Sequence, residues 1–247
     1  RIIRINGDGT IRMIYQGIEA STTGSYTMIS NRLTFNSSVN NNMYVGYMYG
    51  SSGNYATTHA NINNSSIKTV LDNWYYYLAN YAEYIDGNAG FCGDRTPSTI
   101  ESSSNGRGGT GTTTTYYGAY IRLVSNNNPS LQCDSQDIYT TTDSSSGNKS
   151  LQCPIGLITA DEAALTGITW NNANTGSYLY TGQDYWTMSP YDYRGGAGVF
   201  YVWSEGSLNY NGVSGSAGVR PVINLKSSIS ISGIGTTTDP FKIVGAN

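Results

Sequence analysis

The residue types that most often perform chemistry are few in this chain and lie far apart. The only histidine, His59, has no evident serine or cysteine partner that it could activate as a nucleophile. Asp161 and Glu162 follow Thr159 in the pattern of a helix N-terminus, which explains both acids without catalysis. Other acidic residues stand singly in predicted loops, so the sequence shows no carboxylate pair for acid–base work. It therefore predicts no catalytic residue and no enzymatic activity.

The three cysteines show no metal-binding pattern. Cys92, Cys133 and Cys153 have no CxxC spacing and no histidine partner, so we expect neither a metal site nor a cofactor. At most one intramolecular disulfide is possible. We expect Cys92 to pair with Cys133 and Cys153 to be a small buried residue, although Cys133 and Cys153 could exchange these roles.

Aromatic and amide residues instead concentrate near the C-terminus. Two segments with alternating apolar residues, 185–190 and 218–225, predict buried strands on either side of a stretch rich in Tyr, Asn, Ser and Gly. Rings supply contact area at low entropic cost and small polar residues supply adaptable hydrogen bonds, as in antibody paratopes. The stretch 185–220 is therefore the predicted ligand-binding region. Its expected ligand contacts are Tyr191, Asp192, Tyr193, Arg194, Tyr201, Trp203, Asn209, Tyr210, Asn211, Ser214 and Ser216.

Residues 199–203 illustrate how this region should divide between core and surface. Because neighbouring strand residues face opposite sides of a sheet, we expect Phe200 and Val202 to point inward. Val199, Tyr201 and Trp203 should then point outward. Arg220 is interpreted as a buried arginine that binds loop carbonyl groups, with direct ligand contact as the alternative.

The composition excludes some partners. Only 12% of the 247 residues are charged and the net charge is −3, with no basic cluster, so nucleic acid is not an expected partner. The sequence contains no stretch of 18 apolar residues, so we expect neither a membrane span nor membrane contact. The low charge suits an extracellular, cell-surface protein. The chain begins within a predicted strand and without methionine, and we expect an upstream segment to be missing.

The predicted helices and strands that would position these residues form one α+β domain spanning 1–247. We expect two helices, small antiparallel sheets and long loops. Residues 1–16 predict a hairpin, and 120–124 predict a strand. A helix should begin at Ser65 or Ser66 and end near 86–87, and a second should begin after Thr159. Serine- and threonine-rich loops are expected at 96–118 and 140–150, and a short hairpin at 229–243.

Five segments of the chain occur in the same order in a known family. The chain resembles surface proteins of gut-associated Gram-positive bacteria, whose members are often similar to type IV pilins. The resemblance covers nearly the whole sequence and implies display at the cell surface or assembly into pili. The segments that carry it are 1–9, 88–95, 154–162, 185–190 and 218–225.

The C-terminal pattern also resembles the C-type-lectin-like fold of formylglycine-generating-enzyme-like domains. It is similar to the variable proteins of diversity-generating retroelements, in which residues before a Gly-Val-Arg motif are diversified. Gly218-Val219-Arg220 occupies the matching place. The paired cysteines with which formylglycine-generating enzymes hold copper have no counterpart in this stretch. The Glu-Pro-Asn and Gln-Pro-Asp motifs of calcium-dependent lectins are absent from the sequence.

The resemblance and the residues together predict an extracellular ligand-binding or adhesion protein. Its expected partner is an unknown protein or glycan on another cell, a phage or a host surface. One alternative is a structural, pilin-like subunit of a surface filament that assembles with copies of itself. Another is a carbohydrate-binding module that does not use calcium.

Overall fold

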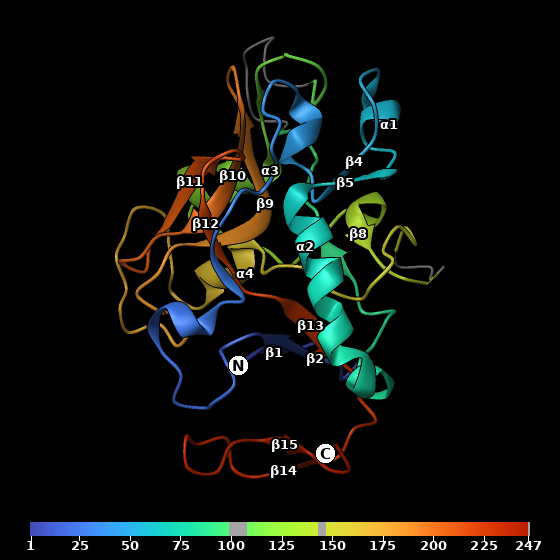
Figure 1. The fold of residues 1–247 in the computed structure, drawn as a ribbon. Coiled ribbons are helices and arrows are strands. Elements are labelled where there is room, and N and C mark those ends of the chain that lie inside the picture. Colours follow the sequence, from blue (N-terminus) through green and yellow to red (C-terminus); the bar gives the residue numbers. More distant parts are fainter. Residues whose placement is uncertain (99–107, 143–146, 247) are drawn as a thin grey trace.

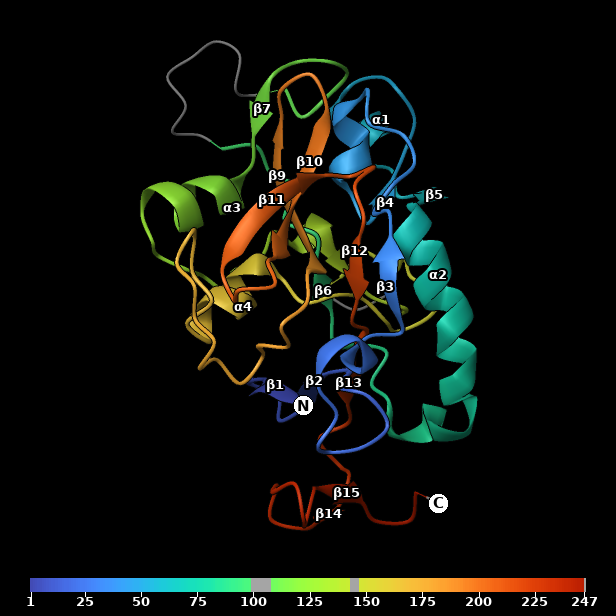
Figure 2. The same ribbon diagram turned by 60° about the vertical axis from the view of Figure 1, so that its left-hand side comes forward.

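A six-stranded sheet joins segments that lie far apart in the sequence (Figures 1 and 2). The computed structural model describes residues 1–98, 108–142 and 147–246. The central strand of this sheet runs antiparallel to two of its neighbours and parallel to a third. In order, the strands are β11 (Leu208–Gly212), β10 (Ala197–Val202), β9 (Tyr185–Tyr193), β12 (Ala217–Val219) and β3 (Ser30–Leu33), and β7 (Thr115–Tyr116) also pairs with β9.

A three-stranded antiparallel sheet lies below the first in Figure 1. It contains the predicted N-terminal hairpin, formed by β1 (Ile2–Ile5) and β2 (Ile11–Ile14), together with β13 (Val222–Leu225). The predicted strand 218–225 is thus two strands in two sheets. Pro221 separates them, because proline has no amide hydrogen to continue a ladder.

Three small strand pairs complete the β structure. They are β4 (Met48–Tyr49) with β5 (Asn63–Asn64), β6 (Phe91–Cys92) with β8 (Ile138–Tyr139), and β14 (Ile231–Ser232) with β15 (Lys242–Ile243). The last pair is the expected C-terminal hairpin, and Figures 1 and 2 show it apart from the rest of the fold. Of the two predicted polar loops, residues 99–107 and 143–146 lie outside the described residues.

The first predicted helix is confirmed. α2 (Ser66–Tyr75) continues as the 3-10 helix η3 (Tyr76–Tyr84), and the side chain of Ser65 accepts a hydrogen bond from the amide of Lys68. Ile67 and Leu71 are buried because their spacing places both on one face of the helix. Further short helices are α1 (Tyr55–Thr58), η1 (Gly24–Thr27), η2 (Asn42–Val45) and η5 (Ser135–Asp137).

The second predicted helix is also confirmed, whereas the predicted strand at 120–124 is wrong. α4 (Ala160–Leu165) begins with the expected capping box between Thr159 and Glu162. Residues 120–124 instead belong to α3 (Gly118–Tyr120) and the π-helix η4 (Ile121–Ser125) that follows it. A short apolar run fits a strand or a helix equally well by periodicity. Here the helix buries Ile121 and lets Arg122 reach two aspartates.

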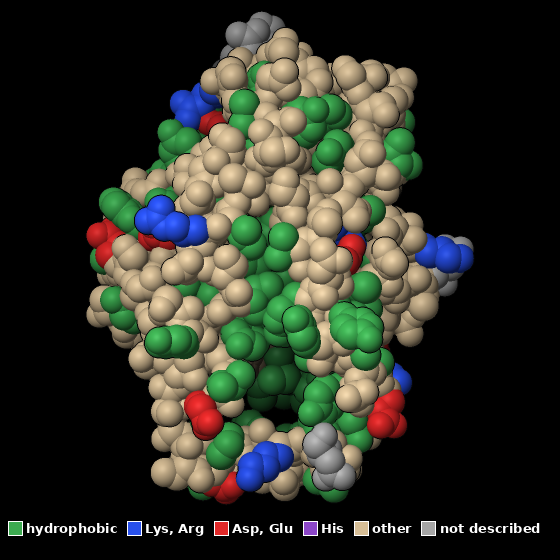
Figure 3. Space-filling view, in the orientation of Figure 1, with side chains coloured by type: hydrophobic (Ala, Val, Ile, Leu, Met, Phe, Trp, Pro, Cys, Tyr) green, Lys and Arg blue, Asp and Glu red, His purple; other side chains and the backbone are tan. Residues whose placement is uncertain are grey.

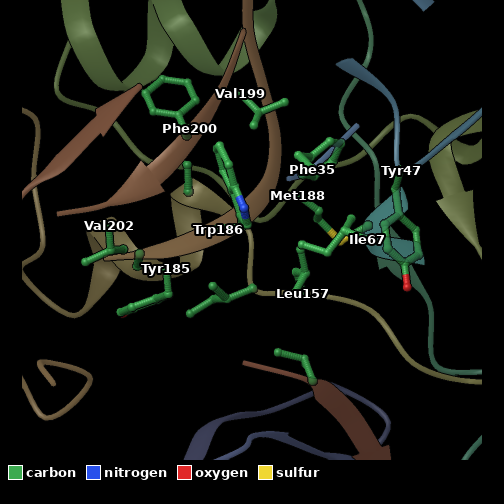
Figure 4. Close-up of a cluster of buried hydrophobic side chains, with 14 of the residues drawn as sticks. Phe35, Tyr47, Ile67, Leu157, Tyr185, Trp186, Met188, Val199, Phe200 and Val202 are labelled. Carbon is green, nitrogen blue, oxygen red and sulfur yellow. The ribbon is translucent and has the colours of Figure 1, made fainter. Parts of the chain in front are cut away.

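The core surrounds Trp186 on β9, which is fully buried (Figure 4). Its indole nitrogen donates a 2.7 Å hydrogen bond to the carbonyl oxygen of Leu33, and Phe35 packs edge-on against its ring. Tyr201 of β10 contacts Trp186 from the neighbouring strand. The large ring is thus both buried and hydrogen-bonded, as a tryptophan in a core requires.

The division of residues 199–203 between core and surface is only partly as predicted. Phe200 and Val202 are buried and Trp203 is exposed, as expected, but Val199 is completely buried and Tyr201 is half-buried. The reason is that both faces of the sheet are covered. η2 packs against β9 and β10, and the amide of Ala197 donates to the carbonyl oxygen of Val39.

Arg220 has the predicted structural role. The side chain is buried and donates three hydrogen bonds, to the carbonyl oxygens of Tyr15 and Leu179 and to the side-chain oxygen of Gln16. Its guanidinium also lies over the ring of Tyr185. Arg220 therefore connects the end of β12 to the N-terminal hairpin and to the loop before β9.

The predicted disulfide is present, because Cys92 is bonded to Cys133. Cys153 is a free thiol, but it is half-buried rather than buried as expected. Within the described residues, no helix is long and apolar enough to cross a membrane. The architecture is of the α+β class, with helices and mainly antiparallel sheets in separate parts of the fold.

Candidate binding surface

One face of strands β9, β10 and β11 carries a cluster of aromatic rings. Tyr210 stacks on Tyr191, with 4.2 Å between the ring centroids and 4° between the planes. Trp170 lies nearly parallel to both rings, 5.4 Å from Tyr191 and 6.4 Å from Tyr210. Phe200 meets Tyr191 edge-on at 5.0 Å. Offset and edge-on ring pairs of this kind stabilise one another beyond simple burial.

Two more tyrosines and an arginine extend the cluster. Tyr120 packs edge-on against Tyr191 at 5.1 Å, and Tyr116 lies 4.6 Å from Tyr120. The guanidinium of Arg194 lies 5.6 Å from the ring centre of Tyr116 and 6.0 Å from that of Tyr210. Together these residues form a continuous group, which we call the aromatic face: Tyr116, Tyr120, Trp170, Tyr191, Arg194 and Tyr210.

Backbone pairing fixes the segments that supply the aromatic face. Trp170 forms a parallel bridge with Leu208, whose amide donates a 2.9 Å hydrogen bond to the carbonyl oxygen of Thr169. Tyr116 pairs with Asp192 where β7 joins β9. Figure 2 shows β7 and α3 beside the strands β9, β10 and β11. The rings are thus mounted on paired strands and on a helix rather than on one long loop.

Arg194 lies in the turn between β9 and β10. The next residue, Gly195, has a φ of 85°, a backbone conformation that glycine adopts without strain. The Nε group of Arg194 donates to the carboxylate of Asp192, which is buried, whereas 46% of the Arg194 side chain is exposed. Burial raises the pKa of Asp192 above its ordinary value, although Arg194 acts in the opposite direction. The buried carboxylate therefore anchors an arginine whose outer end faces solvent.

Three of the predicted ligand contacts are not at the surface. Tyr191, Asp192 and Tyr193 are buried, so the expectation that they are exposed is wrong. They belong to β9, the central strand of the sheet, which packs against η2, α3 and α4. Tyr191 instead supports the ring of Tyr210, and burial raises its pKa above the ordinary tyrosine value. Asp192 acts through Arg194.

The remaining predicted contacts fall in several places. Tyr210 and Arg194 belong to the aromatic face, whereas Asn209, the neighbour of Tyr210 on β11, points to the opposite side of the sheet and donates a 3.2 Å hydrogen bond to Asn171. Tyr201 packs on Trp186, and Trp203 lies in the turn between β10 and β11. Asn211 lies within β11 near its end, and the exposed Ser214 and Ser216 lie in the turn between β11 and β12.

The sequence prediction missed three members of the aromatic face. Tyr116 comes from the end of the low-complexity stretch 96–118, Tyr120 from the segment predicted as a strand, and Trp170 from the loop after α4. Tyr116 lies on β7 and Tyr120 in α3, so no local spacing in the sequence brings their rings together.

A charged cavity of about 320 Å³ lies near the disulfide. Its arginines are all paired with carboxylates: Arg122 with Asp94 and Asp161, and Arg4 and Arg12 with Glu162. Burial raises the pKa of Asp94 to about 7, against the opposing effect of Arg122. Because these charges satisfy one another, we assign the cavity a structural role. The described residues contain no group of three or more His, Cys, Asp or Glu side chains that could hold a metal ion.

An apolar groove of about 960 Å³ lies between the three-stranded sheet and the C-terminal hairpin. Figure 3 shows it as a hollow lined with hydrophobic side chains. Met13 and Ile223 come from the sheet, Trp74 and Leu78 from α2 and η3, and Phe241 from the hairpin region. The groove is separate from the aromatic face, because none of the six residues of the aromatic face lines the groove.

Comparisons with known proteins match part of this chain to one family. A family described as a domain of unknown function (DUF6273) matches residues 135–227. The matched range contains α4, β9 to β13 and the residues Trp170, Arg194 and Tyr210, whereas Tyr116 and Tyr120 precede it. Searches of curated proteins and of solved structures gave no match.

Proposed function

We propose that this protein is an extracellular, non-enzymatic binding protein that contacts its ligand through the aromatic face. The observation that carries the proposal is the set of nearly parallel rings of Trp170, Tyr191 and Tyr210 with Arg194 held beside it. A flat ring gives a ligand a large contact area, and the polar edge of tyrosine remains able to hydrogen-bond. Arginine and aromatic residues are also the types that dominate binding energy at recognition surfaces.

The supporting framework favours recognition because it is already ordered. Tyr210 rests on a buried tyrosine, and Arg194 is held by a buried carboxylate. Side chains fixed before binding lose less conformational entropy when a ligand arrives. The proposed ligand is a protein or a glycan on another cell, a phage or a host surface.

Several features support the proposed C-type-lectin-like fold and the proposed extracellular location. Two capped helices, the six-stranded sheet around β9, and a buried Arg220 after Gly218-Val219 support a C-type-lectin-like arrangement. The disulfide suits an oxidising, extracellular environment. Exposed Tyr210, Ser214 and Ser216 are positions that a retroelement could diversify with little effect on the core.

A pilin-like structural subunit is the second candidate function, and the apolar groove favours it. Filament assembly needs a surface that packs against another segment or another copy. Electron microscopy of the protein in its full natural form would separate the candidates. Filaments that persist after Tyr210 is replaced by alanine would support a structural role alongside binding.

The principal test compares two substitutions at equally exposed rings. Tyr210 and Trp203 are each 42% exposed, but only Tyr210 belongs to the aromatic face. Tyr210→Ala should weaken binding to a responding glycan, matrix protein or intact cell about tenfold or more, the effect of losing one ring anchor. Trp203→Ala should leave binding within about twofold of wild type on the same scale. Binding is measured by biolayer interferometry after an initial screen on arrays and cells.

Equal affinities of wild type and Tyr210→Ala for every responding target would contradict the proposal. Thermal unfolding of both variants controls for loss of structure. Tyr210→Ala removes one stacking partner of Tyr191, so we expect its stability to fall by only about 1 kcal/mol.

A further inference from the structure

Arg194 combines a fixed position with unused hydrogen-bonding capacity. Its Nε group binds Asp192, while its guanidinium lies over Tyr116 and near Tyr210. Within the described part of the chain, the structure shows no hydrogen-bond acceptor for its two terminal amino groups. An arginine presents five N–H donors in a planar fork. The outer edge of this fork therefore remains available to a ligand.

The geometry beside this edge suits one chemical class. The half-exposed ring of Tyr210 lies 6.0 Å from the guanidinium. A sugar ring places its C–H face on an aromatic ring. A planar carboxylate matches the arginine fork with two parallel hydrogen bonds.

We propose that the ligand of the aromatic face is an acidic saccharide, with its carboxylate on Arg194 and its ring on Tyr210. This inference rests on the proposed binding function of that face. Asp192 is a positioning residue: it holds the Nε edge, so that the opposite edge points outward. Because its buried carboxylate balances the charge of Arg194, attraction to anions in general is weak. Selectivity then depends on the two-point match between carboxylate and fork.

The test uses pairs of probes that differ only in the acid. Sialyllactose is compared with lactose, and galacturonate oligomers are compared with their methyl esters, by isothermal titration calorimetry. The wild-type protein should bind the acid of at least one pair about tenfold or more tightly than its neutral counterpart, as expected for a charge-assisted, bidentate contact. The pair that responds identifies which acidic sugar supplies the carboxylate.

Two variants distinguish this inference from a structural effect. Combining Arg194→Gln with Asp192→Asn removes both charges, avoids a lone buried carboxylate, and should abolish the preference for the acid. Arg32→Gln, at an exposed arginine on β3, should leave the preference unchanged. Equal binding of acid and neutral probes by the wild type, or an unchanged preference in the double variant, would overturn the inference. So would the absence of binding to every probe.

These outcomes are separable from failure of the proposed function. If Tyr210→Ala still weakens binding to another target while no acidic sugar binds, the aromatic face is a binding surface for a different ligand. If Tyr210→Ala has no effect on any target, both proposals are wrong.

Discussion

Replacing Glu162 with glutamine should lower the free energy of unfolding by about 3–5 kcal/mol, the usual cost of removing one partner from a buried ion pair. The carboxylate lies 2.5 Å from Nε of Arg12 and 2.9 Å from Nη1 of Arg4. It also accepts a 2.9 Å hydrogen bond from the amide of Thr159 at the start of α4. An amide in its place would carry no charge and would point N–H groups at N–H groups. Arg12, which is 1% exposed, would then lack a counter-charge.

Denaturation in guanidinium chloride at neutral pH measures this effect. Glu83→Gln provides the matched control, because Glu83 is exposed on η3. The control should change the free energy of unfolding by less than about 0.5 kcal/mol, as surface substitutions usually do. A wild-type midpoint and slope for Glu162→Gln would show that this ion-pair cluster does not stabilise the junction between β1, β2 and α4.

Removing the disulfide should lower the free energy of unfolding by a similar amount. Cys92 and Cys133 are 41 residues apart, and closing a loop of this length stabilises the folded chain by about 3–4 kcal/mol in the chain-entropy account. The bond ties β6 to the segment before η5, beside the ion pairs of Arg122. The double variant Cys92→Ser with Cys133→Ser should therefore unfold at a clearly lower denaturant concentration than the parent.

The free thiol requires a control of its own. The substitution Cys153→Ser should change the free energy of unfolding very little. It removes the free thiol, so thiol exchange is prevented when the double variant is made in this background. In that background, a reducing agent should lower the midpoint of the parent to that of the double variant. Identical midpoints with and without reductant would mean that the bond does not stabilise the fold.

Local signals in the sequence predicted much of the framework. The spacing of Ile67 and Leu71 with the cap at Ser65 located α2, and Thr159 with Glu162 located the start of α4. These signals succeed because a helix terminus and an apolar stripe depend on neighbours within a few residues. The alternation around Trp186 likewise located the start of β9.

The candidate site was less predictable because it depends on contacts between distant segments. Tyr116 reaches the aromatic face only through the pairing of β7 with β9. Tyr191 and Tyr193 were expected at the surface, since alternation along a strand does not reveal whether one face or both are covered. Val199 illustrates the same limit, because residues near η2 cover the face that it was expected to expose.

The buried residues that hold the fold together are largely separate from the exposed residues of the aromatic face. Arg220, Trp186 and Glu162 are buried and hydrogen-bonded, so they determine the fold. Tyr210 and Arg194 lie outside this network except for Tyr191 and Asp192 beneath them. Substitutions at the exposed pair should therefore leave the core intact, as the proposed diversified binding surface requires.

The tryptophans allow the most direct measurement of the central claim, that ligand binds at the aromatic face. The four indole N–H groups report four regions: Trp170 the aromatic face, Trp203 the turn between β10 and β11, Trp74 the apolar groove and Trp186 the core. In a nitrogen-15 NMR titration with a bound ligand, the Trp170 signal should shift progressively while the other three stay in place. A shift of the Trp74 or Trp203 signal with Trp170 unchanged would contradict this account.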